Sequence, residues 1–123
     1  MLTNPEASHY LFASGGTSGK PRYVAWTPEE FALSGKITGE GFRALGISPK
    51  DKVANLLRAG ALWTGFLAFN RALEETGCTI LSMTCNQEPE HTLELLDEHA
   101  PNVIMAMSSA LLALADTALQ KGW

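Results

Sequence analysis

The chain has 123 residues, 46% hydrophobic and 18% charged, a balance typical of one globular domain with its own core. Its net charge is −4, it has no apolar run near the ~18 residues that cross a membrane, and its N-terminus does not resemble a signal peptide. We therefore expect a cytoplasmic protein that does not bind membrane. Because no basic stripe with interleaved aromatic residues is present, we also expect no binding to nucleic acid.

The charge is unevenly distributed along the chain. Residues 1–60 hold seven Lys or Arg and five Asp or Glu, a net charge of +2. Residues 61–123 hold two Lys or Arg and eight Asp or Glu, a net charge of −6. An anionic ligand is therefore expected to bind to the first half of the chain.

The cysteines and histidines do not form a recognisable site. Cys78 and Cys85 have no histidine pair near them, so we expect no zinc site and read them as thiols in a reducing cytoplasm. His9, His91 and His99 are scattered, which favours surface or structural roles. The sequence therefore offers no catalytic residue and no metal ligand.

The first predicted element is a hairpin with an unusual tip. Apolar, aromatic and β-branched runs at 10–13 and 23–26 predict two strands, most simply paired antiparallel. Between them lies the sequence S-G-G-T-S-G-K-P-R, residues 14–22, called here the glycine-rich segment. It is longer than most hairpin turns, which need only two to five residues.

The glycine-rich segment has the composition of an anion site. Its glycines permit positive φ and close approach of the main chain, so that successive amides can point at one ligand. Hydroxyl and cationic side chains add further donors, and a polyphosphate is the simplest ligand that uses them all. The residues expected to bind phosphate are Ser14, Gly15, Gly16, Thr17, Ser18, Gly19 and Lys20, with Arg22 adding positive charge.

Two familiar phosphate loops are excluded by spacing. A Walker A loop would need glycine at Ser14 and a hydroxyl residue at Pro21, and it would open a helix. A dinucleotide fingerprint would also need glycine at position 14 and a helix, whereas a strand is predicted to follow. A plain glycine-rich hairpin turn without a ligand remains the alternative.

A helix is predicted from residue 28 to about residue 45. Thr27 is suited to cap it, Pro28 to occupy its first position and Glu30 to complete a capping box, and Gly46 ends it. Interior glycines weaken a helix, so their presence predicts close packing against another surface. These glycines are Gly35, Gly39 and Gly41.

The remaining chain alternates strand and helix three times. Strands are predicted at 52–57, 78–83 and 103–107, and helices from residue 60 or 61, from 89 or 90, and from 108 or 109. The second and third strands are nearly continuous apolar runs, which predicts burial on both faces. The expected fold class is α/β: a flavodoxin-like or Rossmann-like parallel sheet of about three strands with flanking helices, plus the N-terminal β-hairpin carrying the phosphate loop.

We expect a single partial domain over residues 1–123. Residues 1–27 form the hairpin with its phosphate loop, and 28–123 form a helix followed by three strand–helix units. In open α/β sheets ligands bind at the carboxyl ends of the strands, here residues 58–61, 83–88 and 107–109. Trp63 lies near this edge; core packing is its expected role, and lining an acyl pocket is the alternative.

The glycine-rich segment resembles a known signature. S-G-G-T-S-G-K-P-R is similar to T-S-G-T-T-G-K-P-K, the phosphate-binding motif of the adenylate-forming (AMP-binding) superfamily. Thr17 and Ser18 occupy its two hydroxyl positions, whereas Gly15 departs from it, since a hydroxyl residue is usual there. Residues 51–53 and 60–75 resemble more narrowly the branch of phenylacetate–CoA ligases and acyl-protein synthetases. The resemblance covers most of the chain.

The resemblance implies an internal fragment of the large N-terminal domain of an ATP-dependent acyl-CoA ligase. In that family a carboxylic acid attacks the α-phosphate of MgATP, an acyl-adenylate forms, and coenzyme A or another thiol takes the acyl group. The implied cofactors of the parent enzyme are ATP, Mg²⁺ and coenzyme A, with a carboxylic acid as substrate. The chain has no segment matching the family's adenine, ribose or lid elements, so we expect it to be inactive alone.

Two alternatives of other classes stay open. The chain could be a stand-alone nucleotide-binding or regulatory module, or a non-catalytic α/β scaffold that oligomerises. A sheet cut from a larger domain exposes an edge and apolar faces, so a homo-oligomer is also expected of a fragment.

Overall fold

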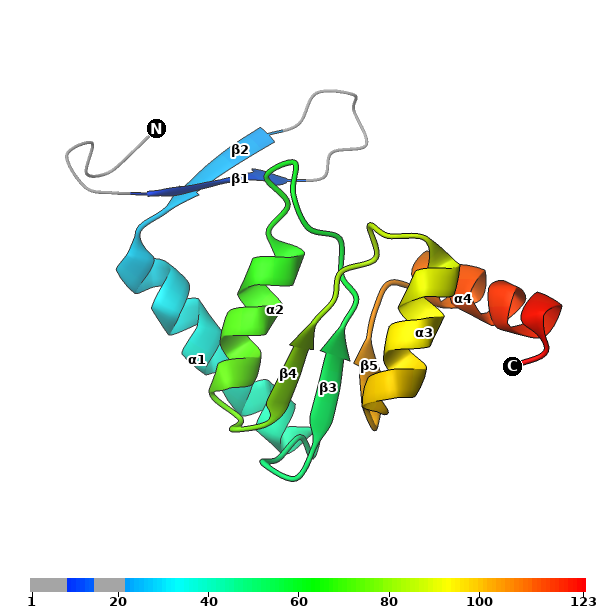
Figure 1. The fold of residues 1–123 in the computed structure, drawn as a ribbon. Coiled ribbons are helices and arrows are strands. Elements are labelled where there is room, and N and C mark those ends of the chain that lie inside the picture. The colour runs from blue at the N-terminus through cyan, green and yellow to red at the C-terminus, as the bar shows by residue number, and fades with distance from the viewer. Residues whose placement is uncertain (1–8, 15–21) are drawn as a thin grey trace.

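The computed structural model describes residues 9–14 and 22–123, which form five strands and four helices (Figure 1). In chain order the elements are β1 (Tyr10–Ser14), β2 (Arg22–Trp26), α1 (Pro28–Ala44), β3 (Lys52–Asn55), α2 (Gly65–Glu74), β4 (Thr79–Ser82), α3 (Pro89–His99), β5 (Val103–Met105) and α4 (Ser108–Lys121).

Two separate sheets organise these elements. Strands β1 and β2 pair antiparallel as a hairpin, whereas β3 lies between β4 and β5 in a three-stranded parallel sheet. The hairpin lies beyond the carboxyl ends of the parallel strands (Figure 1). This confirms the α/β class, the parallel sheet with its helices and the N-terminal hairpin.

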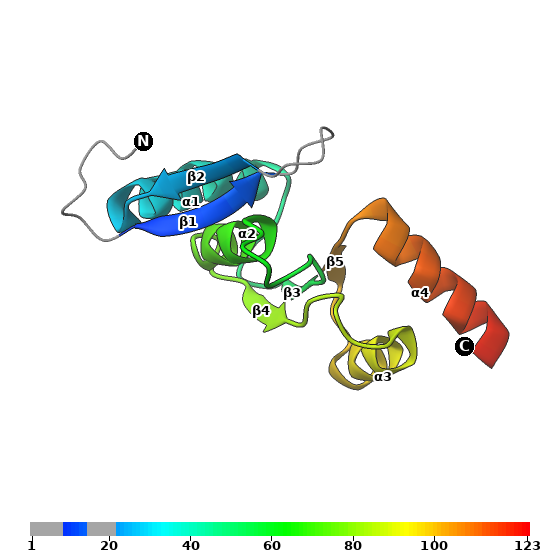
Figure 2. The ribbon, with the colours of Figure 1, turned by 90° about the horizontal axis from the view of Figure 1, so that it is seen from above.

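The helices cover the sheet from both sides. Viewed from above, α1 and α2 lie on one side of the sheet and α3 on the other, with α4 beside α3 (Figure 2). Helices α1 and α2 pack closely because two of the three glycines predicted to permit contact, Gly35 and Gly39, are buried against α2. Gly41 is exposed with nothing near it, so the packing prediction is wrong there.

The core is centred on β3. Val53, Ala54 and Leu56 are fully buried because β3 is the central strand of the parallel sheet. Leu73 of α2 is fully buried as well. The prediction that the strands at 78–83 and 103–107 are buried on both faces is wrong. Strands β4 and β5 are the edges of this sheet and keep partly exposed side chains; Ile104 is 44% exposed.

Helix α1 begins as its sequence predicts. The Thr27 hydroxyl accepts a hydrogen bond from the Glu30 amide at 3.1 Å, and Glu30 Oε1 accepts one from the Thr27 amide at 2.8 Å. The bond from the Thr27 amide is the largest cause of the lowered pKa of Glu30. The start of α2 differs from prediction: it begins at Gly65 rather than at residue 60 or 61.

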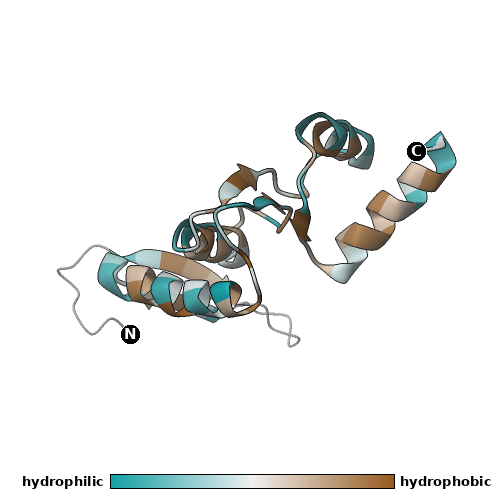
Figure 3. Cartoon of the chain, turned by 90° about the horizontal axis from the view of Figure 1, so that it is seen from below, coloured by the Kyte–Doolittle hydropathy of each residue, from teal (hydrophilic) through white to brown (hydrophobic). Residues whose placement is uncertain are grey.

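Apolar side chains remain exposed on α4. Leu112 and Leu119 are 66% and 79% exposed, and Trp123, just after the helix, is 55% exposed; Figure 3 shows several hydrophobic positions along α4. No helix within residues 9–14 and 22–123 has the length and apolar character needed to cross a membrane.

Candidate functional site

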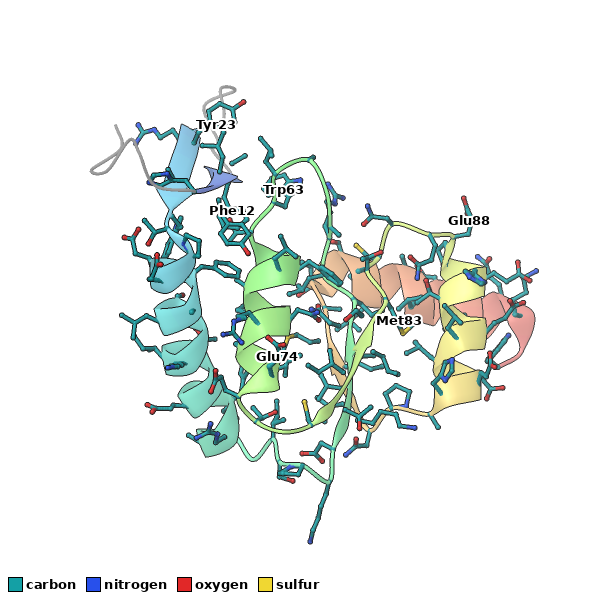
Figure 4. The ribbon with its side chains drawn as sticks, turned by 60° about the vertical axis from the view of Figure 1, so that its left-hand side comes forward. Phe12, Tyr23, Trp63, Glu74, Met83 and Glu88 are labelled. Atoms are coloured by element: carbon teal, nitrogen blue, oxygen red, sulfur yellow. The ribbon has the colours of Figure 1, made fainter. Side chains whose placement is uncertain are left out.

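The hairpin is attached to the carboxyl end of the parallel sheet. The Ala13 amide donates a hydrogen bond of 2.8 Å to the Leu62 carbonyl, and Ala13 and Trp63 form a parallel bridge. Phe12 is 4% exposed, and its ring lies 5.7 Å from the ring of Phe31 in α1. Figure 4 shows Phe12 and Trp63 together between the hairpin and the start of α2. Strand β1 is therefore held by α1 on one side and by the chain after β3 on the other.

This attachment fixes both ends of the glycine-rich segment. Ser14, the last residue of β1, pairs with Arg22, the first residue of β2, and Ser14 directly follows Ala13. The main chain of Ser14 is thus placed beside the chain that follows β3. The other residues expected to bind phosphate, Gly15, Gly16, Thr17, Ser18, Gly19 and Lys20, lie outside the described residues, so their role stays a prediction.

The chain after β3 forms a strained turn. The Trp63 amide donates to the Gly60 carbonyl at 3.0 Å, and the residues between them, Ala61 and Leu62, have φ of 51° and 64°. Positive φ at both central residues is the pattern of a type I′ turn, which favours Asn and Gly. A left-handed conformation costs other residues ~1–2 kcal/mol each, and such strain tends to cluster at functional sites. We call residues 60–63 the strained turn.

A pocket of about 460 Å³ lies beside the strained turn. Apolar side chains supply most of its wall, and Arg58 adds one positive charge. Its lining residues are Leu57, Arg58, Trp63, Gly65, Cys85, Met107, Ser109 and Ala110. They come from the three segments that follow β3, β4 and β5. Ligands of open parallel sheets bind at these carboxyl ends of the strands.

Trp63 is a correction to the sequence analysis. Core packing was its expected role, but its residue is 39% exposed and it forms part of this pocket. The expectation assumed a helix that already includes Trp63, whereas α2 begins at Gly65 and Trp63 belongs to the turn before it. We call this cavity the Trp63 pocket.

A buried amide holds the chain that leads from β3 to the pocket. Asn55 is fully buried; its Nδ2 donates to the Phe66 carbonyl and to Asn70 Oδ1, both at 3.2 Å. Its Oδ1 accepts a bond of 3.2 Å from the Leu57 amide. Asn55 therefore holds the chain that leaves β3 against the start of α2. Asn55 was not among the predicted site residues; the only signal in the sequence is a lone asparagine at the end of an apolar strand.

Of the cysteines and histidines considered in the sequence, Cys85 lines the Trp63 pocket and the others do not. Cys78 and Cys85 are free thiols of intermediate burial, and His91 and His99 are exposed on α3. In the part of the chain that the structure describes, no three His, Cys, Asp or Glu residues are grouped so that they could hold a metal ion.

Comparison with curated proteins finds phenylacetate-coenzyme A ligases. The chain is 33% identical over 112 residues to the enzyme of Pseudomonas putida and 33% identical over 106 residues to that of Escherichia coli. These alignments cover 91% and 86% of this chain but only 25% and 24% of the two enzymes. The chain thus spans about a quarter of the length of these relatives. No family model matches it.

Comparison with solved structures finds the same architecture. A 2-hydroxyisobutyryl-CoA ligase, solved in an open conformation with 2-HIB-AMP and CoA, matches with a TM-score of 0.81 at 18% identity, over 98% of this chain and 27% of that one. The adenylation domain of a carboxylate reductase from Mycobacterium chelonae matches with a TM-score of 0.60 at 20% identity, over 90% of this chain and 18% of that one. At these identities the likeness shows the fold. Sequence and fold together place the chain in the adenylate-forming superfamily, as a relative of the phenylacetate-coenzyme A ligases that corresponds to about a quarter of such an enzyme.

Proposed function

We propose that this chain supplies the ATP-phosphate contacts and part of the acid-binding pocket of an ATP-dependent acyl-CoA ligase. The carrying observation is the hydrogen bond from the Ala13 amide to the Leu62 carbonyl. Through it, the ends of the glycine-rich segment and the Trp63 pocket come to the same edge of the parallel sheet. Activation of an acid by ATP requires both ligands at one place.

The glycine-rich segment is suited to the charge that develops in this reaction. When a carboxylate attacks the α-phosphate of ATP, the bond to the β-phosphate breaks and pyrophosphate leaves with additional negative charge. Main-chain amides, the Thr17 and Ser18 hydroxyls and the Lys20 ammonium would stabilise that charge without covalent chemistry. The sulfur of coenzyme A would then bond to the acyl carbon of the adenylate, AMP would leave, and the thiol proton would be released.

The Trp63 pocket is suited to the apolar part of the acid. Trp63 and Met107 offer an aromatic face and a flexible thioether, and the volume of about 460 Å³ falls in the range of small-molecule sites. Mg²⁺ accompanies ATP in this chemistry, but the described residues offer no group of ligands that fits it. We therefore assign no step of the reaction to a metal held by these residues.

Titration with pyrophosphate tests the phosphate contacts. Millimolar pyrophosphate added to the ¹⁵N-labelled chain should shift the NMR signals of the amides at 15–20. Binding should be weak, because the adenine and ribose contacts are supplied elsewhere in a complete enzyme. The Lys20→Ala variant should bind at least several-fold more weakly, since it loses a charged partner of the anion.

The matched control is Lys36→Ala, which removes an exposed lysine from α1. It lowers the net charge of the chain by the same amount and should leave pyrophosphate binding unchanged within a factor of about two, because distant surface charges are screened. Equal losses in the two variants, or no shift at 15–20 in the unmodified chain, would refute the proposed phosphate contacts.

A further inference from the structure

Asn86, in the loop after β4, holds the main chain of Ala59 in both directions. Its Nδ2 donates to the Ala59 carbonyl at 2.9 Å, and its Oδ1 accepts from the Ala59 amide at 3.3 Å. One side-chain amide thus satisfies the donor and the acceptor of one residue, as a neighbouring strand would. Ala59 directly precedes the strained turn, so this contact lies at the point where the turn begins.

Asn86 is itself fixed by its own loop. The main-chain amide of Asn86 donates to the Thr84 hydroxyl at 3.3 Å, and that hydroxyl donates to Gln87 Oε1 at 3.1 Å. The Thr84 amide donates to the Asn55 carbonyl at 3.0 Å, which ties this loop to the end of β3. The Asn86 side chain therefore projects from an anchored main chain, which lowers the conformational entropy lost when it binds Ala59.

The strained turn has supports on both sides. Asn86 holds Ala59 before it, and the Ala13 amide bonds to the Leu62 carbonyl within it. Ala61 and Leu62 do not favour positive φ by themselves, so their conformation depends on contacts from outside the turn. Releasing Ala59 should allow the turn to relax, and Leu62 would then move relative to β1.

We propose that Asn86 is a positioning residue that sets the strained turn and, through it, the place of β1 and of Trp63. This rests on the proposed function, because β1 leads into the glycine-rich segment and Trp63 lines the acid pocket. Asn86 is not among the residues that line the Trp63 pocket; it acts through Ala59. The loop after β4 thereby links the pocket wall to the hairpin.

The test is amide hydrogen exchange of the 123-residue chain with Asn86 changed to alanine. Exchange at Ala59 should quicken directly, since its amide loses its acceptor. The informative amides are Ala13 and Trp63, which bond to Leu62 and Gly60 rather than to Asn86; we expect both to exchange about tenfold faster. Asn86→Asp keeps an acceptor for the Ala59 amide but loses the donor, so it should give a smaller increase.

Asn102→Ala is the matched control. Asn102 makes a similar contact at the amino end of the sheet, where its Oδ1 accepts from the Lys52 amide at 2.7 Å and its Nδ2 donates to Asp51 Oδ1 at 2.8 Å. That second bond is the largest cause of the lowered pKa of Asp51. Its removal should leave exchange at Ala13 and Trp63 unchanged.

The outcomes separate this proposal from the proposed function. Unchanged exchange at Ala13 and Trp63 in the Asn86→Ala variant would overturn the positioning role, as would a uniform increase over the whole chain, which would mean a general loss of stability. The exchange test needs no ligand. If the amides respond as expected but the unmodified chain does not bind pyrophosphate, the proposed function fails while the structural link stands.

Discussion

Beside the Trp63 pocket, Ala61 and Leu62 have the least favourable main-chain conformations. Both have positive φ, and neither is a residue that adopts it readily. Their strain is compensated by contacts from Ala13 and Asn86. The composition around the turn gives one hint of this conformation, Gly60, and residues 60–73 otherwise read as a continuous helix. The strained turn could not be predicted because its supports come from distant parts of the sequence.

Replacing Ala61 with glycine should stabilise the protein. Glycine has no Cβ to strain at φ 51°, so the relief of ~1–2 kcal/mol exceeds the ~0.4–1 kcal/mol lost to the greater freedom of the unfolded chain. Urea unfolding should show a gain of up to ~1 kcal/mol. The control is Ala59→Gly, where φ is not positive and only the entropic cost applies. Two variants of equal stability would contradict this account of the turn.

Among the elements, the hairpin and α1 are the best predicted, and the edges of the parallel sheet the worst. Local signals mark α1: Thr27 and Glu30 form the expected capping box. The apolar runs ending at residues 83 and 107 predicted longer and more deeply buried strands than β4 and β5. The burial of a strand depends on which elements lie beside it. An apolar run indicates that a strand is suited to burial, but it does not show which element covers that strand.

The contact between α1 and α2 leads us to expect opposite changes in stability when two glycines of α1 are replaced with alanine. A Cβ added at Gly39 would lie 2.6 Å from Glu75 Cβ and 2.8 Å from the Ala72 carbonyl oxygen, so Gly39→Ala forces the helices apart. We expect a loss of ~1–3 kcal/mol in the free energy of unfolding. Gly41 has nothing within 4 Å of an added Cβ, so Gly41→Ala should stabilise α1 by up to ~1 kcal/mol.

Thermal unfolding of the two alanine variants measures this contrast directly. Gly39→Ala should lower the midpoint and Gly41→Ala should raise it slightly, although both changes add one methyl group to the same helix. If both variants raise the midpoint, helix propensity rather than close packing dominates at these positions, and if both lower it, Gly41 is not the open position described here.

As a whole molecule, the chain corresponds to part of a larger fold, and the Trp63 pocket lies at the carboxyl end of its parallel sheet. The chain aligns with about a quarter of each curated relative, and its edge strands β4 and β5 and the apolar side chains of α4 are left uncovered in this segment. The expected homo-oligomer follows from such surfaces and stays a prediction. The parallel sheet and the crevice were predictable because strand–helix alternation constrains topology.

The central claim is that the glycine-rich segment and the Trp63 pocket belong to one site for phosphate and acid. The most direct measurement is an NMR titration of the ¹⁵N-labelled chain with phenylacetate in the presence of saturating pyrophosphate. The indole N–H signals of Trp26 and Trp123 serve as internal references, because neither residue lines the pocket.

We predict that pyrophosphate shifts the amides at 15–20 and Ala13, and that phenylacetate then shifts the Trp63 indole and the Met107 amide while the pyrophosphate-bound signals persist. Trp63→Ala should abolish the response of Met107 to phenylacetate and leave pyrophosphate binding intact. The claim would be contradicted if phenylacetate displaced pyrophosphate, left Trp63 unaffected, or acted instead at the separate groove between α1 and β5, which Phe42, Ile47 and Ile104 line.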